Sequence, residues 1–391
     1  MSKVIDTEML GDMKRFGELD VSSCFSCGTC TAICPLADND ATFPRRIIRL
    51  AQVGLKDELL SSKELWTCYH CGLCSDSCPQ DADPGEFMAA ARRYAIANYD
   101  RTGLARVLYT RPVLGTVLAV VIAAFFAAFL FIGRGPQNAE EMEFFTFIPD
   151  NVIHWTGIAV MVLMMIAGLA GIVAMVRGVA RRDGVTLTSL VDGKAGLART
   201  GTALWSSLGI ESLGQTRYRR DCKDDEPVEP LYRRRWLIHA MAIWGFLGLM
   251  VATGLDWGLA VIGVKETGTA IPIWYPSRLI GTVAGLMLIY GVGWFMVNRA
   301  TKYNRAASIS TGSDWLLLVL LMITAVTGFV IEVALYMPNP PAWGYWVFLF
   351  HVAIALELML LLPFTKFAHA VYRPVALFFY SLAGHKVLQD A

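Results

Sequence analysis

Residues 66–80, WTCYHCGLCSDSCPQ, contain four cysteines in the pattern Cys-x2-Cys-x2-Cys-x3-Cys-Pro. The same pattern occurs in SCFSCGTCTAICPL, residues 23–36, and the two copies hold eight of the nine cysteines. This spacing is typical of proteins with two [4Fe–4S] clusters, in which the fourth cysteine of each copy ligates the other copy's cluster. We therefore expect two ligand sets, which are Cys24, Cys27, Cys30 and Cys78 for the first cluster and Cys68, Cys71, Cys74 and Cys34 for the second.

The main alternative for these cysteines is structural zinc. Zinc sites usually combine pairs of the Cys-x2-Cys type, whereas two complete four-cysteine copies favour iron–sulfur clusters. His70 lies inside the second copy and is either a neighbour that tunes the cluster potential or, more simply, a polar surface residue. The ninth cysteine, Cys222, is not needed for two clusters, and we interpret it as structural or without a specific role, with a redox or partner-contact role as the alternative.

Residues 1–105 have the pattern of a water-soluble helical domain. FPRRIIRLAQVGLKDELL (43–60) and GEFMAAARRYAIANYD (85–100) alternate apolar and basic residues at helical spacing, and strand alternation is not seen. The first twenty residues lack the apolar core of a signal peptide. We therefore predict a helical dicluster ferredoxin domain in the cytoplasm, where thiols stay reduced.

The remainder of the chain is strongly apolar. The whole chain is 55% hydrophobic and 17% charged, and its net charge of +1 gives no global case for nucleic-acid binding. Six runs are long enough to cross a hydrocarbon layer of about 30 Å, and six on one chain argue against buried helices of a large soluble protein. We expect spans at about 113–133, 151–176, 236–258, 278–298, 314–336 and 344–371.

The predicted fold is therefore all-α, with the ferredoxin domain followed by a six-helix transmembrane cytochrome b bundle. Residues 106–177 hold the first two spans, 178–234 form a cytoplasmic loop, and 235–391 hold the last four spans and a cytoplasmic tail. Lys and Arg gather beside the second, third, fourth and sixth spans on one side, which places both termini in the cytoplasm of an inner-membrane protein. Two interpretations of the 178–234 loop are open. It is a flexible connector, or it docks a soluble partner or folds over the inner surface.

Four of the six histidines lie in or at the edges of the spans, where ionisable residues tend to mark function. His351 and His369 are eighteen residues apart, so one continuous helix would present both from one face, roughly 27 Å apart. When the histidines are matched by their depth in the membrane, His154 pairs with His351 on the outer side and His239 pairs with His369 on the inner side. We interpret the pairs as ligands of two b-type haems, with unrelated core histidines as the alternative.

The N-terminal block resembles the iron–sulfur C subunit of heterodisulfide reductase in its two cysteine motifs and in residues 43–60. The spans resemble the membrane cytochrome b of heterodisulfide reductase and the gamma subunit of respiratory nitrate reductase. In the latter family the paired histidines of the last haem helix have the spacing of His351 and His369. His239, in RRRWLIHAMAIWGFLGLMVATG, matches an earlier haem histidine, but Leu249 stands near the place of its second histidine.

The fusion of both parts resembles the membrane-embedded component of quinone-interacting membrane-bound oxidoreductases of sulfate reducers. This resemblance implies menaquinone as the lipid-soluble carrier. It also implies two cytoplasmic flavoprotein partners related to the flavin-binding component of heterodisulfide reductase. Finally, the resemblance implies that the electrons are delivered towards adenylylsulfate reductase in sulfate respiration.

Two haems and two clusters together predict an electron path between quinone and the cytoplasm. We expect an oxidoreductase subunit that passes electrons from menaquinol to soluble partners, and the alternative is a quinone-reducing membrane anchor of a heterodisulfide reductase-like complex running in the opposite direction. No adjacent Cys-Cys pair supports self-contained disulfide reduction, and a proton pump would rest on Glu357. The candidate quinone-binding residues are Lys265, Glu266 and Arg278, with ordinary loop charges or snorkelling as the alternative.

Overall fold

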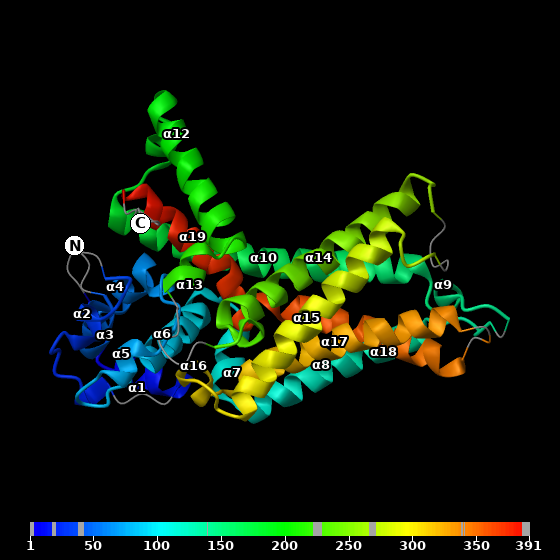
Figure 1. Ribbon diagram of the computed structural model, residues 1–391, viewed down its shortest axis with the longest axis horizontal. Helices are drawn as coiled ribbons and strands as arrows, with labels where there is room; N and C mark the ends of the chain where they lie inside the picture. The colour runs from blue at the N-terminus through cyan, green and yellow to red at the C-terminus, as the bar shows by residue number, and fades with distance from the viewer. Residues whose placement is uncertain are drawn as a thin grey trace.

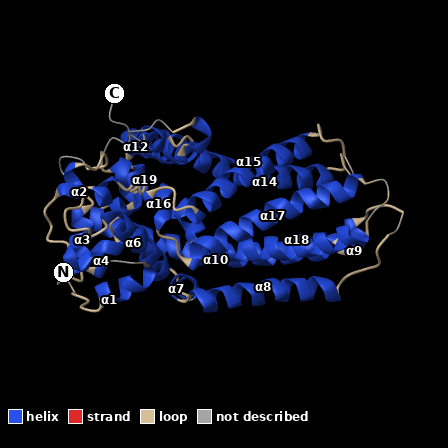
Figure 2. Cartoon of the chain, turned by 60° about the horizontal axis from the view of Figure 1, so that its bottom comes forward, coloured by secondary structure: helices blue, strands red, loops and turns tan. Residues whose placement is uncertain are grey.

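The computed structural model describes residues 4–17, 21–37, 43–138, 140–221, 229–265, 271–337, 339 and 341–384. In this part of the chain all regular secondary structure is helical, as Figure 2 shows, which confirms the predicted all-α class. The N-terminal block lies at one end of an elongated molecule, and the long helices run from it to the other end (Figure 1).

The N-terminal block consists of short helices around one long one. The short helices are α1 (Met9–Met13), α2 (Thr29–Ala32), α3 (Arg45–Gln52), α4 (Lys56–Leu60), α5 (Leu73–Asp76) and α7 (Leu104–Thr110). Nearly every residue of α6 (Pro84–Tyr99) is buried, so α6 is the centre of the block. It begins where Asp83 accepts a hydrogen bond from the Glu86 backbone N–H at 3.2 Å and Pro84 occupies the first turn.

The predicted helix over residues 43–60 is divided in the structure. Helix α3 ends at Gln52 and α4 begins at Lys56, because Gly54 takes a left-handed conformation with φ of 71°. A Cβ at Gly54 would lie 2.3 Å from the Asp6 carbonyl oxygen, so the N-terminal segment packs against a position that only glycine can fill.

Six helices are long and apolar enough to cross a membrane, which confirms the six predicted spans. They are α8 (Pro112–Ile132), α10 (Asp150–Asp183), α14 (Arg235–Val261), α15 (Pro276–Ala300), α17 (Gly312–Tyr336) and α18 (Ala342–Leu361). The short helices α9 (Phe144–Phe147) and α16 (Arg305–Ser308) lie in connections between them. The outer faces of the six carry many exposed large apolar side chains, as a lipid environment requires, and α18 is the most enclosed helix.

Helices α14 and α15 approach each other closely through small residues. A Cβ at Gly245 would lie 2.5 Å from the Leu288 backbone nitrogen, and one at Gly291 would lie 2.6 Å from the Ala242 backbone nitrogen. Glycine at facing positions lets two backbones pack directly, which is the usual way in which helices associate in lipid.

The sixth predicted span, 344–371, is not one continuous helix, and this part of the sequence interpretation is wrong. Helix α18 ends at Leu361, two short 3-10 turns follow, and Thr365 between them is extended with ψ of −178°. Pro363 explains the break, because proline has no backbone N–H and its ring clashes with the preceding helical turn. His369 is instead the first residue of α19 (His369–Leu382), so the argument that one straight helix presents His351 and His369 from one face fails.

The segment predicted as a loop is largely helical. After α10 come α11 (Leu187–Val191), α12 (Gly193–Leu204), a π-helix (Trp205–Leu213) and α13 (Thr216–Asp221). Helix α12 projects sideways from the junction between block and bundle (Figure 1), and the π-helix packs against α19. The described part of this segment is thus folded and packs against the end of the bundle next to the N-terminal block, and its cytoplasmic location stays a prediction.

Buried ion pairs fix the block to the bundle. Helix α10 has 34 residues and is therefore about 51 Å long, so its last turns extend beyond a hydrocarbon layer of about 30 Å. There Asp183 lies 2.5 Å from Lys63 Nζ, and Arg182 donates to Ser62 Oγ at 2.7 Å. The Lys63 side chain is only 7% exposed, so loss of either partner would leave a buried charge unpaired.

Candidate metal centres

The two cysteine motifs fold as structural copies of each other. Ser26 and His70 occupy the same place and have φ of 65° and 56°, and Gly28 and Gly72 follow with φ of 93° and 96°. Each glycine is the N-cap of a one-turn helix, α2 or α5. The left-handed residues turn the chain back on itself between the first and third cysteines, so three thiols can face a common space.

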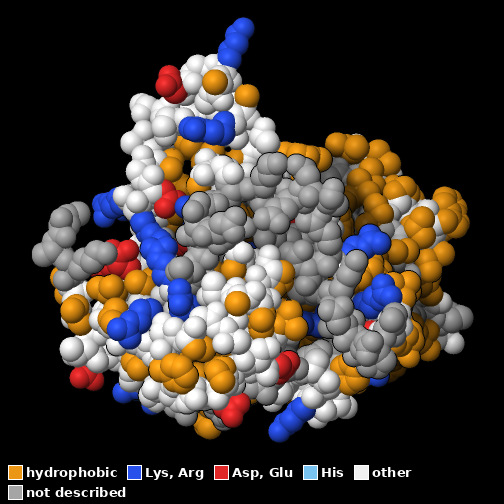
Figure 3. Space-filling model, turned by 60° about the vertical axis from the view of Figure 1, so that its left-hand side comes forward, with side chains coloured by type: hydrophobic (Ala, Val, Ile, Leu, Met, Phe, Trp, Pro, Cys, Tyr) orange, Lys and Arg blue, Asp and Glu red, His pale blue; other side chains and the backbone are white. Residues whose placement is uncertain are grey.

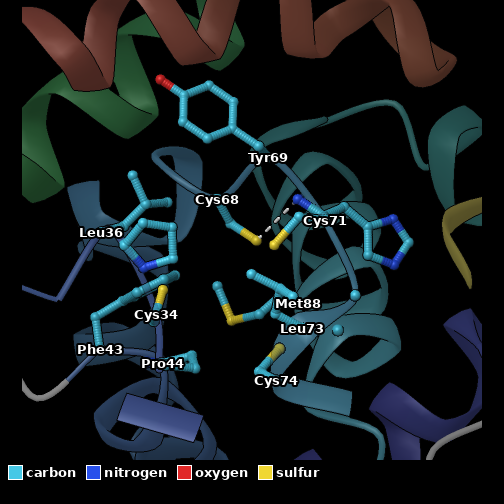
Figure 4. A pocket seen from close by; sticks show the side chains of 14 residues that line it. Cys34, Leu36, Phe43, Pro44, Cys68, Tyr69, Cys71, Leu73, Cys74 and Met88 are labelled. Atoms are coloured by element: carbon cyan, nitrogen blue, oxygen red, sulfur yellow. Dashed lines mark hydrogen bonds between the residues drawn. The ribbon is translucent and has the colours of Figure 1, made fainter. Parts of the chain in front are cut away.

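The thiols gather into the two sets that the motif spacing predicts. One cavity is lined by the thiols of the second set, as Figure 4 shows, namely Cys34, Cys68, Cys71 and Cys74. In the first set, the thiols that interact with Cys30 include Cys24, Cys27 and Cys78. In each set one cysteine comes from the other motif, and ligation by these sets stays a prediction.

The cavity lined by the second thiol set has the chemistry of a cluster site. Burial raises the pKa of Cys34 to about 12, and the nearby thiols of Cys68 and Cys71 add to the shift. Ligation replaces the thiol proton by a metal, so iron allows several thiolates to share such a site. Among the described residues no three His, Cys, Asp or Glu side chains converge on a point that a single ion could occupy. The four thiols surround a space instead, as a cube of four irons requires.

His70 also lines this cavity. It is half-buried, and burial together with the cation of Arg92 lowers its pKa well below the ordinary value. The structure places His70 beside the predicted cluster space, and both interpretations, as a cluster neighbour and as a polar surface residue, stay predictions. Its backbone N–H donates to Cys68 Sγ at 3.3 Å.

The first motif is exposed at Cys27 and at Phe25, whose side chain is 63% exposed. Its Cys24 and Cys34 are half-buried and Cys30 is buried, whereas all four cysteines of the second motif are half-buried. The loop around Cys24 is held by Gln52, whose amide donates to the carbonyls of Val21 at 2.9 Å and Cys24 at 2.8 Å. Figure 3, which brings the end with the ferredoxin block forward, shows hydrophobic side chains interspersed with Lys and Arg on this face.

The structure brings His239 and His369 together, as the depth argument predicts. Their ring centroids are 6.2 Å apart. Two imidazoles that bind opposite faces of one metal at about 2 Å each would have centroids about 6 Å apart. The Nδ1 atom of His239 lies 3.1 Å from Gln215 Oε1, and Nδ1 of His369 bonds the Lys366 carbonyl. Both Nδ1 atoms are thus held by protein acceptors, which orients each ring with Nε2 available for a metal.

Gln215 was not anticipated from the sequence. It is 4% exposed and has a left-handed φ of 51°, and its Nε2 atom has no hydrogen-bond partner among the described residues. A buried amide that holds a histidine on one side and is unsatisfied on the other fits a site with a polar group of a cofactor beside it. No local pattern marks this residue, because it lies in the helical segment that follows the second span.

The outer histidines have different neighbours. His351 Nδ1 lies 2.8 Å from Thr327 Oγ1 on α17, which again leaves Nε2 available. His154 stacks on Trp257 of α14, with centroids 6.0 Å apart and 16° between the planes. His154 and His351 thus make their described contacts with different helices, and their pairing across one haem stays a prediction.

Of the predicted quinone-binding residues, Lys265 already forms an ion pair within the protein. Lys265 Nζ lies 2.6 Å from both carboxylate oxygens of Asp256, and Ser277 donates to the same carboxylate at 2.9 Å. Arg278 lies in the first turn of α15, and Glu266 lies outside the described residues.

Two other residues singled out in the sequence have different outcomes. Glu357 is 1% exposed, and its Oε1 atom has no hydrogen-bond partner among the described residues. Cys222 lies outside the described residues.

Comparisons with known proteins divide the chain. A family model described as Citrate utilization protein B matches residues 137–386, and one described as 4Fe-4S dicluster domain matches residues 20–82. Citrate utilization protein B of Escherichia coli is 24% identical over 387 residues, which cover 96% of this chain and 93% of the relative. No solved structure matches.

The iron–sulfur block has its own relatives. The C subunit of the H(2):CoB-CoM heterodisulfide,ferredoxin reductase of Methanothermobacter thermautotrophicus is 45% identical over 62 residues, or 16% of this chain and 34% of the relative. A protein of Archaeoglobus profundus that is described as similar to the C subunit of heterodisulfide reductase is 37% identical over 103 residues, or 25% of this chain and 54% of the relative. The block is thus homologous to the C subunit of heterodisulfide reductases, which implies an electron-transfer role in an oxidoreductase. The Citrate utilization protein B family model covers more than half of the whole chain. The chain therefore belongs to the citrate utilization protein B family.

Proposed function

We propose that this chain is a membrane electron-transfer subunit that passes electrons between menaquinone in the inner membrane and a soluble partner in the cytoplasm. The observation that carries the proposal is a line of aromatic contacts from the second cysteine motif to the inner histidine pair. Tyr69 stacks on Tyr218 with centroids 5.3 Å apart, and Tyr218 meets the ring of His239 edge-on at 5.5 Å. The predicted cluster and the predicted haem therefore share one wall.

The residues of this wall have separable roles. When bound, the haems and clusters would supply one-electron carriers. His239 and His369 would hold the inner haem, and Gln215 and the Lys366 carbonyl fix the orientation of their rings. Tyr69 and Tyr218, both half-buried, provide the ring contacts between the two sites. The Tyr69 hydroxyl donates to Glu211 at 3.0 Å, which ties this wall to the π-helix.

The two ends of the path face different surroundings. The first motif, with the exposed Cys27, supports a contact with a soluble partner at the cytoplasmic end. At the outer end His154 and His351 would hold the second haem, and a quinone would bind beside Lys265, Glu266 and Arg278. A quinone carbonyl would compete with Asp256 for Lys265, because that pair is already formed.

Two partner classes suit this function. The fusion of cluster domain and bundle supports flavoproteins like the flavin-binding component of heterodisulfide reductase, with adenylylsulfate reductase as acceptor, as the family resemblance implies. The likeness to citrate utilization protein B extends over 96% of the chain and supports a soluble oxidoreductase of citrate-related metabolism instead. The direction of electron flow differs between the two classes, since the first would accept electrons from quinol and the second would deliver electrons to quinone.

The test uses the purified full-length chain in lipid vesicles under anaerobic conditions. Iron and haem are quantified, a menaquinol analogue is added, and the haem α-band and the cluster signals are followed. We expect about eight irons and two b haems per chain, with haem reduction preceding cluster reduction. A protein with full iron content and no haem would overturn the proposal. Oxidation of the reduced protein by adenylylsulfate reductase with its flavoprotein partners, or its reduction by an oxidoreductase of citrate-related metabolism, then separates the partner classes.

A further inference from the structure

Three arginines hold the backbone of the second cysteine motif. Arg92 of α6 donates to the Cys68 carbonyl at 2.8 Å. Arg373 of α19 donates to the carbonyls of Trp66 and Cys68, both at 3.1 Å. Arg235 of α14 donates to the His70 carbonyl at 2.8 Å and lies 3.5 Å from the Cys71 carbonyl. Guanidinium groups from three helices thus converge on one six-residue loop, residues 66–71.

Two of these arginines belong to the helices of the inner histidine pair. Arg235 precedes His239 by four residues on α14, and Arg373 follows His369 by four residues on α19. Residues four apart are neighbours on one helix face. Each helix therefore presents a histidine to the predicted haem and, one turn away, an arginine to the predicted cluster loop. The separation of the two sites is set by helix geometry rather than by flexible connections.

The first motif has the same backbone but is held differently. Its carbonyls at Val21 and Cys24 accept from the neutral amide of Gln52. Around the second motif the cations are offset in part by the Glu211 carboxylate, which accepts from Tyr69, while Arg373 also lies 4.2 Å from the centre of the Tyr69 ring. The guanidinium of Arg45 also lies beside the first motif, where its Nη1 atom would be 3.1 Å from a Cβ at Gly28. The described hydrogen bonds to backbone carbonyls thus come from three guanidinium groups in the second motif and from a neutral amide in the first.

We infer that Arg92, Arg235 and Arg373 are positioning residues that fix the second cysteine loop to α6 and to the two predicted haem-bearing helices, and that they raise the reduction potential of its cluster above that of the first. This inference rests on the proposed function. Reduction adds one negative charge to a cluster, so cations and hydrogen-bond donors near it favour the reduced form. With this order, transfer from the exposed cluster to the buried one is the downhill step, which favours electron flow from the soluble partner towards quinone.

The experiment measures both cluster potentials in the full-length protein by redox-poised electron paramagnetic resonance. Arg235→Gln and Arg373→Gln each remove a charge from the second loop, and Arg101→Gln removes one from an exposed position as the matched control. We expect the potential of one cluster to shift to more negative values in both loop variants and the other cluster to stay unchanged. Neither cluster should shift in the control. Arg373→Lys should retain most of the potential because it keeps the charge.

Unchanged potentials in both glutamine variants at full iron content, or equal shifts of both clusters, would overturn the inference. If a glutamine variant loses iron, the lysine variants decide. Arg235→Lys and Arg373→Lys must then keep the buried cluster with its potential near the wild-type value while haem-to-cluster transfer slows. Loss of that potential with the charge retained would contradict the proposed cause. The cluster potentials themselves can be measured without quinone or haem, so a wild-type protein without haem would overturn the proposed function and leave this inference testable.

Discussion

The two cysteine motifs have the same spacing and the same left-handed turns, but they lie in opposite surroundings. The first has an exposed Cys27 and is held by a neutral amide, whereas the second is half-buried and held by three guanidinium groups. The residue after the first cysteine shows the difference most clearly. It is Phe25, 63% exposed, in one copy and Tyr69, stacked on Tyr218, in the other. Spacing specifies which cofactor can bind, while the surroundings decide to what each site is connected.

The largest expected effect tests whether each site is built from both motifs. Cys78 belongs to the second motif in sequence but to the exposed thiol set in space, and Cys34 has the reverse placement. Cys78→Ser should therefore remove the exposed cluster and Cys34→Ser the buried one, each with loss of about four irons per chain. Iron analysis and the cluster spectra of the two variants distinguish this exchange.

Within this pair each variant is the control for the other. Sites built from one motif each would give the opposite result, since Cys78→Ser would then remove the cluster that contacts the haem helices. The remaining cluster can be recognised by its accessibility to a water-soluble oxidant, which should be greater for the exposed one.

The next effect concerns the haem beside the buried motif. His369→Ala removes one ring of the inner pair, and His154→Ala removes the predicted outer ligand. We expect each variant to keep about one of two haems, with His369→Ala losing the haem that exchanges electrons with the second motif. Haem content and the α-band under menaquinol give the measurement. Two haems retained in His154→Ala would show that another residue ligates the outer haem with His351.

Local spacing predicted most of what could be derived from the sequence. The thiol sets follow from ligands two or three residues apart, and the six spans follow from runs of apolar residues. The break after Leu361 was missed because hydropathy alone continues through Pro363 to Tyr372, although the proline itself was a signal. The inner histidine pair was nonetheless identified, because depth in the membrane does not depend on helix continuity.

Contacts between distant segments could not be derived. Gln215 and Tyr218 lie in a polar segment that the sequence left open, and only the fold brings them to His239. Arg235 and Arg373 each stand four residues from a predicted haem ligand, a regularity visible in the sequence. The function of this spacing depends on the contact between the second cysteine loop and both helices. No local sequence pattern indicates that contact.

The smallest effect separates the packing of Tyr69 from its hydroxyl. Tyr69→Phe keeps the ring between Arg373 and Tyr218 but removes the hydrogen bond to Glu211. Because the buried Glu211 carboxylate then loses one hydrogen bond, we expect the π-helix to open more easily by about 1–3 kcal/mol, measured as faster hydrogen exchange over residues 205–213. Haem-to-cluster transfer should stay near the wild-type rate.

Phe25→Leu at the equivalent position of the first motif is the matched control. Because the Phe25 side chain is largely exposed, exchange over residues 205–213 should not change in this variant. Tyr69→Ala removes the ring as well and should slow transfer between haem and buried cluster while both cofactors remain bound. Equal transfer rates in Tyr69→Ala and Tyr69→Phe would mean that the aromatic wall only supports the junction, and the comparison between the two motifs would then depend on the arginines alone.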